Sequence, residues 1–323
     1  MNYLNLIEPY NMKKLILLFL LLFTIKSHAQ MYNDSSFNAN VVDPKFKKGY
    51  GPKILIDAGH NNFAVELGLN KPLFDVASSD GYQIKIDSMQ FTKEYLSNYN
   101  IVVILTAMPF KYGSKDFSLF FNGQKQADVF TFTTNELNAL HDWVTNGGSL
   151  LMFSEHAPID KSVTPLFNKF GIQLSTGIVV DSLNSDTPIE MPSWNHSFLK
   201  FTSKNGLLNT EHPVTKGEKK NERVSNILTH GGGGLTGDGY TNILKLSSSA
   251  MIKKWNGTMP TGTPNSQCLA GNVGKGKLVA LGDCNGFGAM FIKSGEYKLS
   301  SGMQVSGYDW KQFVLNTLHW LSL

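Results

Sequence analysis

The chain has 323 residues, of which 17% are charged and 41% are hydrophobic, and its formal net charge at pH 7 is +4. The first 29 residues contribute +2 of this charge, through Lys13, Lys14 and Lys26 against Glu8, which leaves +2 for the rest. This near balance argues against a nucleic-acid-binding surface, and the length suits one large domain or two small ones.

The first 29 residues have the pattern of a secretory signal peptide. A charged start, Met12 to Lys14, precedes the apolar run Leu15 to Ile25, and Ser27-His28-Ala29 resembles a cleavage site. The apolar run is too short for a comfortable membrane span. We therefore expect residues 1–29 to be a signal peptide, with an N-terminal prefix before Met12, and residues 30–323 to form a single periplasmic or secreted domain without membrane insertion.

Three apolar runs in the first half predict buried strands: Ile54 to Ile56, Ile101 to Leu105 and Ser149 to Phe153. Helical patterns separate them, and Thr133 with Glu136 has the spacing of a helix-capping box. This β-α-β rhythm predicts an α/β fold with a mainly parallel sheet flanked by helices.

Further elements complete the expected fold. A half-polar strand is expected at Tyr82 to Ile86 and an antiparallel C-terminal hairpin between Cys268 and Cys284. The two cysteines can form a cross-strand disulfide or remain as buried thiols. Further helices are expected at Val65 to Ser79 (split by Pro72), Phe91 to Tyr99, Thr164 to Phe170 and Trp310 to Leu321. Further strands are expected at Ile172, Val224 to Thr229, Ile243 to Leu246 and Ala250 to Trp255. A long loop from Met108 to Phe132 is expected to be functional or mobile, and Ser182 to Lys200 is expected to be an inserted loop.

Polar side chains follow four of the expected strands. They are Asp57, His60, Asn61 and Asn62; Glu155 and His156; Thr229 and His230; and Asp283 and Asn285. The carboxyl ends of parallel strands meet at one rim, which is where open α/β sheets bind ligands, so these groups are expected to form a shared site. The alternative is that Asp57 and the asparagines cap a helix and that each histidine is a satisfied core residue.

Several familiar motifs are missing from the sequence. No Ser or Thr follows Lys275 or Lys277 in P-loop register, and neither a G-x-S-x-G nor an H-E-x-x-H motif occurs. Ligands for a metal would have to come from separate loops. We therefore expect no cofactor and no metal, with a divalent ion as the alternative.

The motifs I-L-I-D-A-G-H-N-N-F, S-E-H-A-P, H-P-V-T-x-G and G-K-G-K-L-V-A-L-G-D resemble the exported domain-of-unknown-function 4350 family. The resemblance covers nearly all of residues 30–323 and implies a flavodoxin/amidotransferase-like sheet of the class I glutamine-amidotransferase type. Ser154 and Glu155 stand where an amidotransferase carries its cysteine nucleophile, so glutaminase chemistry is not expected. Some members are similar to ulvan oligosaccharide dehydratases.

The resemblance implies an exported carbohydrate-active lyase that eliminates water from the terminal uronate of polysaccharide-derived oligosaccharides. His60 or His156 would be the base and Glu155 the acid. The remaining rim residues, Asp57, Asn61, Asn62, Thr229, His230, Asp283 and Asn285, would bind the substrate, and a metal could replace the donors among them.

The alternative function is a non-catalytic carbohydrate-binding module of a polysaccharide-degrading system. Trp194, Tyr112 and Phe287 would then be its stacking surfaces. The two functions differ in one geometric requirement: acid–base catalysis needs His60, Glu155 and His156 within hydrogen-bond reach of one another.

Overall fold

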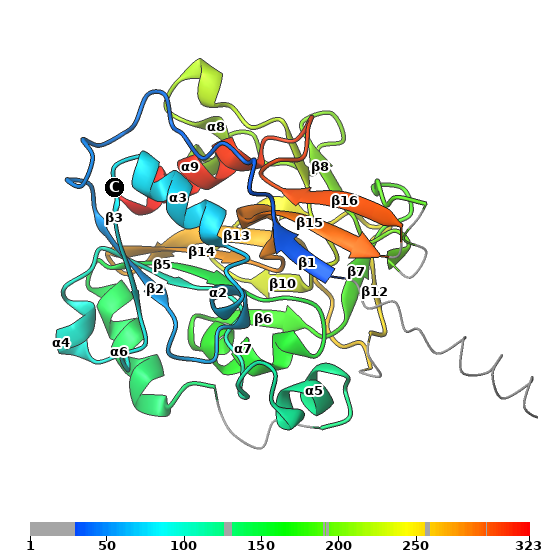
Figure 1. The fold of residues 1–323 in the computed structure, drawn as a ribbon, viewed down its shortest axis with the longest axis horizontal. Coiled ribbons are helices and arrows are strands. Elements are labelled where there is room, and N and C mark those ends of the chain that lie inside the picture. The colour runs from blue at the N-terminus through cyan, green and yellow to red at the C-terminus, as the bar shows by residue number, and fades with distance from the viewer. Residues whose placement is uncertain (1–29, 126–130, 190, 192–193, 256–258, 295) are drawn as a thin grey trace, which may run out of the picture.

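The computed structural model describes residues 30–125, 131–189, 191, 194–255, 259–294 and 296–323 (Figure 1). The expected signal peptide, residues 1–29, lies outside the described residues. No helix in the described part of the chain is long and apolar enough to cross a bilayer.

The described residues contain a mixed nine-stranded central sheet. Five neighbouring strands are parallel: β3 (Gln83–Asp87), β2 (Lys53–Asp57), β4 (Ile101–Ile104), β5 (Ser149–Phe153) and β14 (Gly276–Leu281). Beyond β14 the pairing is antiparallel, with β13 (Ser266–Val273), β10 (Gly234–Gly237) and β6 (Ile172–Ser175) in this order, and β11 (Thr241–Lys245) beside β13. The predicted α/β class is confirmed, and so are the three apolar strands in one sheet.

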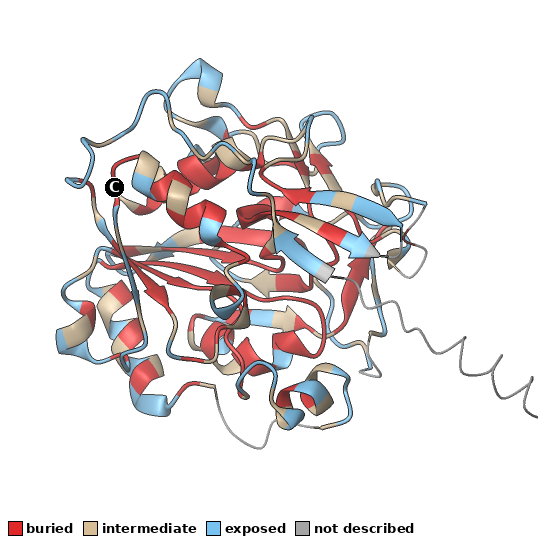
Figure 2. Ribbon diagram, in the orientation of Figure 1, coloured by how far each residue is buried: buried red, intermediate tan, exposed pale blue. Residues whose placement is uncertain are grey.

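The central strands are buried on both faces because their apolar residues alternate between two cores (Figure 2). In β2, Ile54 and Ile56 pack toward α3 (Lys71–Ser79) and α9 (Trp310–Leu321), whereas Leu55 packs toward α4 (Lys93–Leu96), α6 (Thr134–Thr145) and α7 (Ile159–Lys169). The sheet therefore lies between two helical layers (Figure 1).

Smaller elements surround this core. An outer antiparallel sheet contains β1 (Gln30–Asn33), β15 (Ala289–Ser294) and β16 (Tyr297–Gly302). Two further antiparallel pairs join β7 (Ile178–Val180) to β12 (Met251–Lys253) and β8 (Lys200–Thr202) to β9 (Asn226–Leu228). The short helices are α2 (Phe63–Glu66), α5 (Lys115–Phe121), α8 (Pro213–Lys216), η2 (Lys220–Glu222) and η3 (Asn285–Phe287).

The structure corrects several details of the sequence-based fold. The hairpin β13–β14 is confirmed, but β14 enters the middle of the sheet beside β5, and Cys268 pairs in register with Leu281 instead of Cys284. Both cysteines are therefore free, buried thiols. The chain between Met108 and Phe132 contains α5, and α7 begins at Ile159 instead of Thr164, because it accommodates Pro165 in its interior.

Candidate functional site

Two buried carboxyl groups meet where β5 and β14 end side by side. Glu155 follows β5 and Asp283 follows β14, so the parallel pairing of these strands brings the two residues together. The backbone N–H of Cys284 donates to Oε1 of Glu155 over 2.8 Å. Oδ2 of Asp283 accepts from the backbone N–H of His230 at 2.6 Å, and its Oδ1 accepts two bonds of 2.8 Å from Asn285.

The charge of Asp283 acts on the Glu155 carboxyl group, and the side-chain amide of Asn285 donates to both, at 3.4 Å to Oε1 of Glu155 and 2.8 Å to Oδ1 of Asp283. Burial and the neighbouring charge of Asp283 raise the pKa of Glu155 well above its ordinary value. Burial also raises the pKa of Asp283, but the bonds donated by His230 and Asn285 oppose that shift. Of the two groups, Glu155 retains a proton more readily, because Asp283 has more donors to stabilise its charge.

Two neutral imidazoles lie beside the carboxyl pair. Nδ1 of His156 is 2.8 Å from the carbonyl oxygen of Ala157, and a carbonyl can only accept, so Nδ1 carries the proton and Nε2 has the lone pair. Burial lowers the pKa of His156 to about 4. Burial and the nearby His156 lower the pKa of His230 to about 3, and Nδ1 of His230 lies 3.1 Å from the hydroxyl of Ser301. Both imidazoles are therefore uncharged at neutral pH, with one ring nitrogen protonated in each.

Two tryptophans pack against these imidazoles. The ring of His156 lies 5.6 Å from Trp194 and 5.3 Å from Trp255, and Trp194 is also 5.4 Å from His230. The two indoles lie 4.5 Å apart. They come from different parts of the chain, one from the segment before β8 and the other from the segment just after β12.

The same indoles line a surface pocket of about 270 Å³, which we call the tryptophan pocket. Its lining residues are Ile178, Val180, Trp194, Asn195, Ser197, Lys253, Lys254 and Trp255. Two lysines and no carboxylate are present in this lining, so the pocket favours an anionic ligand. Half-buried indoles next to aliphatic side chains suit the apolar face of a ring-shaped ligand.

The four glycines after His230 allow this segment to contact the backbone at the end of β14. A Cβ atom at Gly232 would lie 2.3 Å from the carbonyl oxygen of Gly282, and the N–H of Gly233 donates to that oxygen over 2.8 Å. The glycines therefore allow the chain to run against the end of β14, and this close approach places the N–H of His230 on Asp283.

His60 belongs to a second cluster on the rim. Its Nδ1 lies 2.9 Å from Oδ1 of Asp57 and its Nε2 3.2 Å from Oε1 of Glu136, and the ring packs between Phe91 and Phe132. Burial alone would lower the pKa of His60, but the bonds and charges of Asp57 and Glu136 outweigh it and raise the pKa. Both ring nitrogens are held by carboxylates, which favour the protonated form, and no hydrogen bond joins the ring to Glu155 or His156 among the described residues.

The remaining predicted residues lie between or behind the clusters. The Asn61 side chain donates to the carbonyl oxygen of Met108 at 3.2 Å, and the Asn62 side chain accepts from the Thr106 hydroxyl at 3.3 Å. Thr229 donates to the side chain of Gln267 over 2.6 Å and is buried away from the tryptophan pocket. The structure therefore brings together Glu155, His156, His230, Asp283 and Asn285, and separates them from Asp57 and His60.

Sequence reasoning missed several members of both clusters. Glu136 was predicted only as a capping residue, which it also is, since it completes a capping box with Thr133. Ser301 belongs to β16 and Trp255 lies two residues after β12, and the places of both strands beside the rim depend on long-range pairing. Phe287, predicted as a stacking surface, is buried against Phe153 and Trp310. In the described part of the chain no group of three His, Cys, Asp or Glu side chains is arranged to hold a metal ion.

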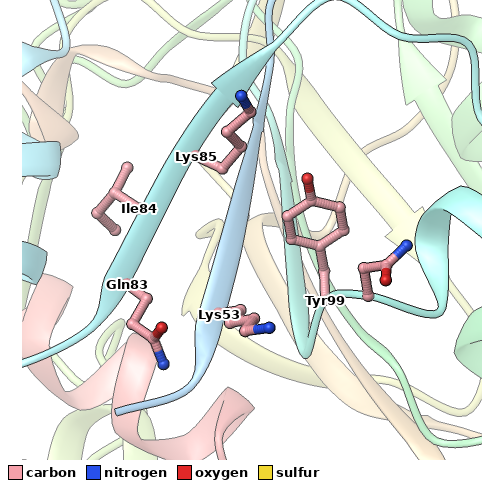
Figure 3. Close-up of a pocket in the computed structure, with 6 residues that line it drawn as sticks. Lys53, Gln83, Ile84, Lys85 and Tyr99 are labelled. Atoms are coloured by element: carbon pink, nitrogen blue, oxygen red, sulfur yellow. The ribbon is translucent and has the colours of Figure 1, made fainter. Parts of the chain in front are cut away.

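A second depression, of about 290 Å³, lies at the opposite ends of the strands (Figure 3). It is lined by Lys53, Gln83, Ile84, Lys85, Asn98 and Tyr99, at the amino-terminal ends of β2 and β3 and just before β4. This depression has no histidine or carboxylate in its lining and lies away from both rim clusters. The tryptophan pocket, in contrast, touches the rim through the contacts of its indoles with His156 and His230.

No family model matches the chain, and no curated protein sequence matches it. Among solved structures the chain is similar to the mmIFT52 N-terminal domain, with a TM-score of 0.51 and 16% identity over 83% of this chain and 96% of that domain. This likeness is one of fold alone.

Two further solved structures have lower scores. A putative ThuA-like protein from Bacteroides uniformis ATCC 8492 has a TM-score of 0.42 at 13% identity, over 86% of this chain and 95% of that one. A cytoplasmic protein from Salmonella typhimurium has a TM-score of 0.40 at 14% identity, over 84% of this chain and 99% of that one. The structural neighbours thus include a ThuA-like protein, a group with the class I glutamine-amidotransferase-like fold.

Proposed function

We propose that this chain is an exported enzyme, periplasmic or secreted, that removes water from the terminal uronate of polysaccharide-derived oligosaccharides. We also propose that it belongs with the exported domain-of-unknown-function 4350 proteins and is related to ulvan oligosaccharide dehydratases. The observation that supports this function best is the tryptophan pocket, which combines two indoles with Lys253 and Lys254. Its indoles contact the neutral imidazole of His156, which follows Glu155 in the chain, and the pKa of Glu155 is raised.

The reaction requires one base and one acid. His156 has the free nitrogen lone pair that a base needs, at Nε2, and would take the acidic proton from the carbon beside the uronate carboxylate. The electron pair released forms the double bond to the neighbouring carbon and breaks its bond to the hydroxyl. Glu155 would donate its proton to the departing oxygen, so that water leaves and the proton on His156 afterwards restores Glu155.

Charge develops on the uronate carboxylate when its neighbouring carbon loses a proton. Lys253 and Lys254 line the pocket and supply positive charge toward that group, while the amide of Asn285 lies on the Glu155–Asp283 pair and orients it. In this assignment His60 and Asp57 hold the rim together and take no part in proton transfer.

The test is incubation of the purified protein with saturated, uronate-terminated oligomers. Absorbance of the new conjugated double bond and product mass are followed together. Loss of one water with a new chromophore supports dehydration, whereas chain cleavage would identify a polysaccharide lyase or hydrolase. His156→Gln should lower turnover by roughly two to four orders of magnitude, and His141→Gln, a partly exposed histidine on α6, is the matched control. A chelator shows whether a divalent ion takes part.

A non-catalytic carbohydrate-binding module is the second candidate. The separation of His60 from Glu155 and His156 favours it, because the full set of three groups proposed for catalysis is not assembled in one place. This function predicts saturable binding of uronate oligomers that Trp194→Ala abolishes, without change in absorbance or product mass. Turnover by the wild-type protein would rule it out.

A further inference from the structure

A cluster of aromatic rings leads from the tryptophan pocket across α5 to the protein surface. The ring of Phe121 contacts His156 at 6.4 Å and stacks on Phe117 at 5.7 Å. Phe117 in turn holds Tyr112 edge-to-face at 5.1 Å. The segment 111–121 therefore connects the pocket to an outlying tyrosine through continuous ring contacts.

The far end of this cluster is an exposed platform. Tyr112 is 42% exposed, and its ring lies nearly parallel to that of Phe63, at a centroid distance of 6.4 Å and an angle of 19°. An exposed tyrosine held from behind by a buried phenylalanine presents a flat, rigid face to solvent. Such faces supply contact area at low conformational cost in ligand recognition.

Two cations accompany this platform. Lys111 and Lys115 are exposed and flank Tyr112 in sequence, and neither forms an ion pair with another described residue. The acid on the same segment, Asp116, is 3.1 Å from Lys125 and so is already paired. The segment thus offers uncompensated positive charge beside its aromatic face.

We propose that this platform is an outer subsite for further sugar units of the same polyanionic uronate chain whose terminal unit occupies the tryptophan pocket. The inference rests on the proposed function for the identity of the ligand. Four successive ring contacts of 5.1 to 6.4 Å link Trp255 to Tyr112, and among the described residues no ring contact joins the two directly, so the platform is separate from the pocket. Tyr112 stacks on a sugar face, and Lys111 and Lys115 face the carboxylates carried by the additional units.

The test is a calorimetric binding series with saturated uronate oligomers from the dimer to the hexamer. Wild-type affinity should rise with length, and Tyr112→Ala should lower hexamer affinity roughly three- to tenfold while leaving dimer affinity unchanged. Tyr112→Phe keeps the ring and should bind as wild type. Tyr50→Ala, which removes a tyrosine that is 74% exposed elsewhere, is the matched control.

A second variant tests the charge. Lys111→Gln combined with Lys115→Gln should weaken hexamer binding and reduce its dependence on salt, with no effect on the dimer. Tyr112→Ala binding every length like wild type would overturn the outer subsite and leave the proposed function standing. Failure of the wild-type protein to bind any uronate oligomer would overturn both.

Discussion

The Nε2 atom of His60 lies 3.2 Å from Oε1 of Glu136, and this contact ties the loop after β2 to the first turn of α6. Glu136 also accepts from the backbone N–H of Thr133 at 3.0 Å and of Phe91 at 3.3 Å. One carboxylate therefore joins three segments of the chain, with His60 as the cation that neutralises it. We call this arrangement of His60, Asp57 and Glu136 the His60 cluster, and it stabilises one end of the rim.

Replacing His60 should consequently affect stability more than catalysis. His60→Ala leaves Asp57 and Glu136 buried without their shared cation, which should cost roughly 3 kcal/mol or more of unfolding free energy. Urea denaturation measures this loss, and His141→Ala should stay within about 0.5 kcal/mol of wild type. A His60→Ala protein that is as stable as wild type but inactive would assign His60 to catalysis instead.

The His60 cluster should also make the free energy of unfolding fall as pH rises. The pKa of His60 is raised in the folded protein, because the bonds and charges of Asp57 and Glu136 outweigh burial. Its contribution is complete below the unfolded-state pKa of about 6.5 and is lost as pH rises through the folded value. The difference in unfolding free energy between wild type and His60→Gln should therefore shrink with rising pH, and a constant difference would contradict the raised pKa.

The two imidazoles beside the tryptophan pocket should make the free energy of unfolding fall as pH drops. His156 and His230 are neutral in the folded protein, with pKa values lowered by burial to about 4 and about 3. The unfolded chain binds protons at both positions below about pH 6.5 whereas the folded chain does not, so stability falls as pH drops from 6.5 toward 4. The midpoint of thermal unfolding against pH checks this, and the double variant His156→Gln with His230→Gln should flatten the curve.

The paired carboxyl groups should respond differently to amide substitution. Glu155→Gln replaces the carboxyl group whose pKa is raised by burial with a neutral amide, so the fold should be retained while the proton donor is lost and turnover falls by roughly 10²- to 10⁴-fold. Asp283→Asn replaces one acceptor oxygen, either for the His230 N–H or for Asn285, with a donor, and should cost roughly 1–3 kcal/mol. Denaturation and turnover measured on both variants test the assignment, and the reverse pattern would place the proton on Asp283.

The strands nearest the rim could be predicted because their patterns are local. Ile54 to Ile56 and Ile101 to Leu105 are apolar without alternation, which is typical of parallel strands with a helix on each face. Strand β10 was missed because two of its four residues, Gly234 and Gly237, are glycines and three more glycines precede it, so no side-chain pattern marks the strand. The outer hairpin β15–β16 was missed for a related reason, because its outward residues are mostly polar and its partner β1 is far away in sequence.

The residues of the candidate site were also only partly predictable from the sequence. Glu155 and Asp283 could be predicted because residues that follow parallel strands converge whatever the order of those strands. His230 follows β9, which pairs antiparallel with β8 outside the central sheet, and it reaches Asp283 through its backbone N–H. Convergence alone could not show that His60 lies apart from these residues, since that separation depends on which strands are neighbours and on Glu136 reaching across from α6. Pairing order is a property of the whole chain, and short motifs contain little information about it.

The position of β14 has a consequence for how this chain is made. During synthesis β2, β3, β4 and β5 are made before β14. One edge of β5, residues 149–153, therefore has no neighbouring strand until residues 276–281 have been made. Until then the growing protein carries a bare hydrophobic strand edge, which is the kind of surface that draws chains into aggregates. Assembly of the sheet, and of the carboxyl pair at its rim, is therefore a late and cooperative event, so a chain truncated before Gly276 should collect in the insoluble fraction.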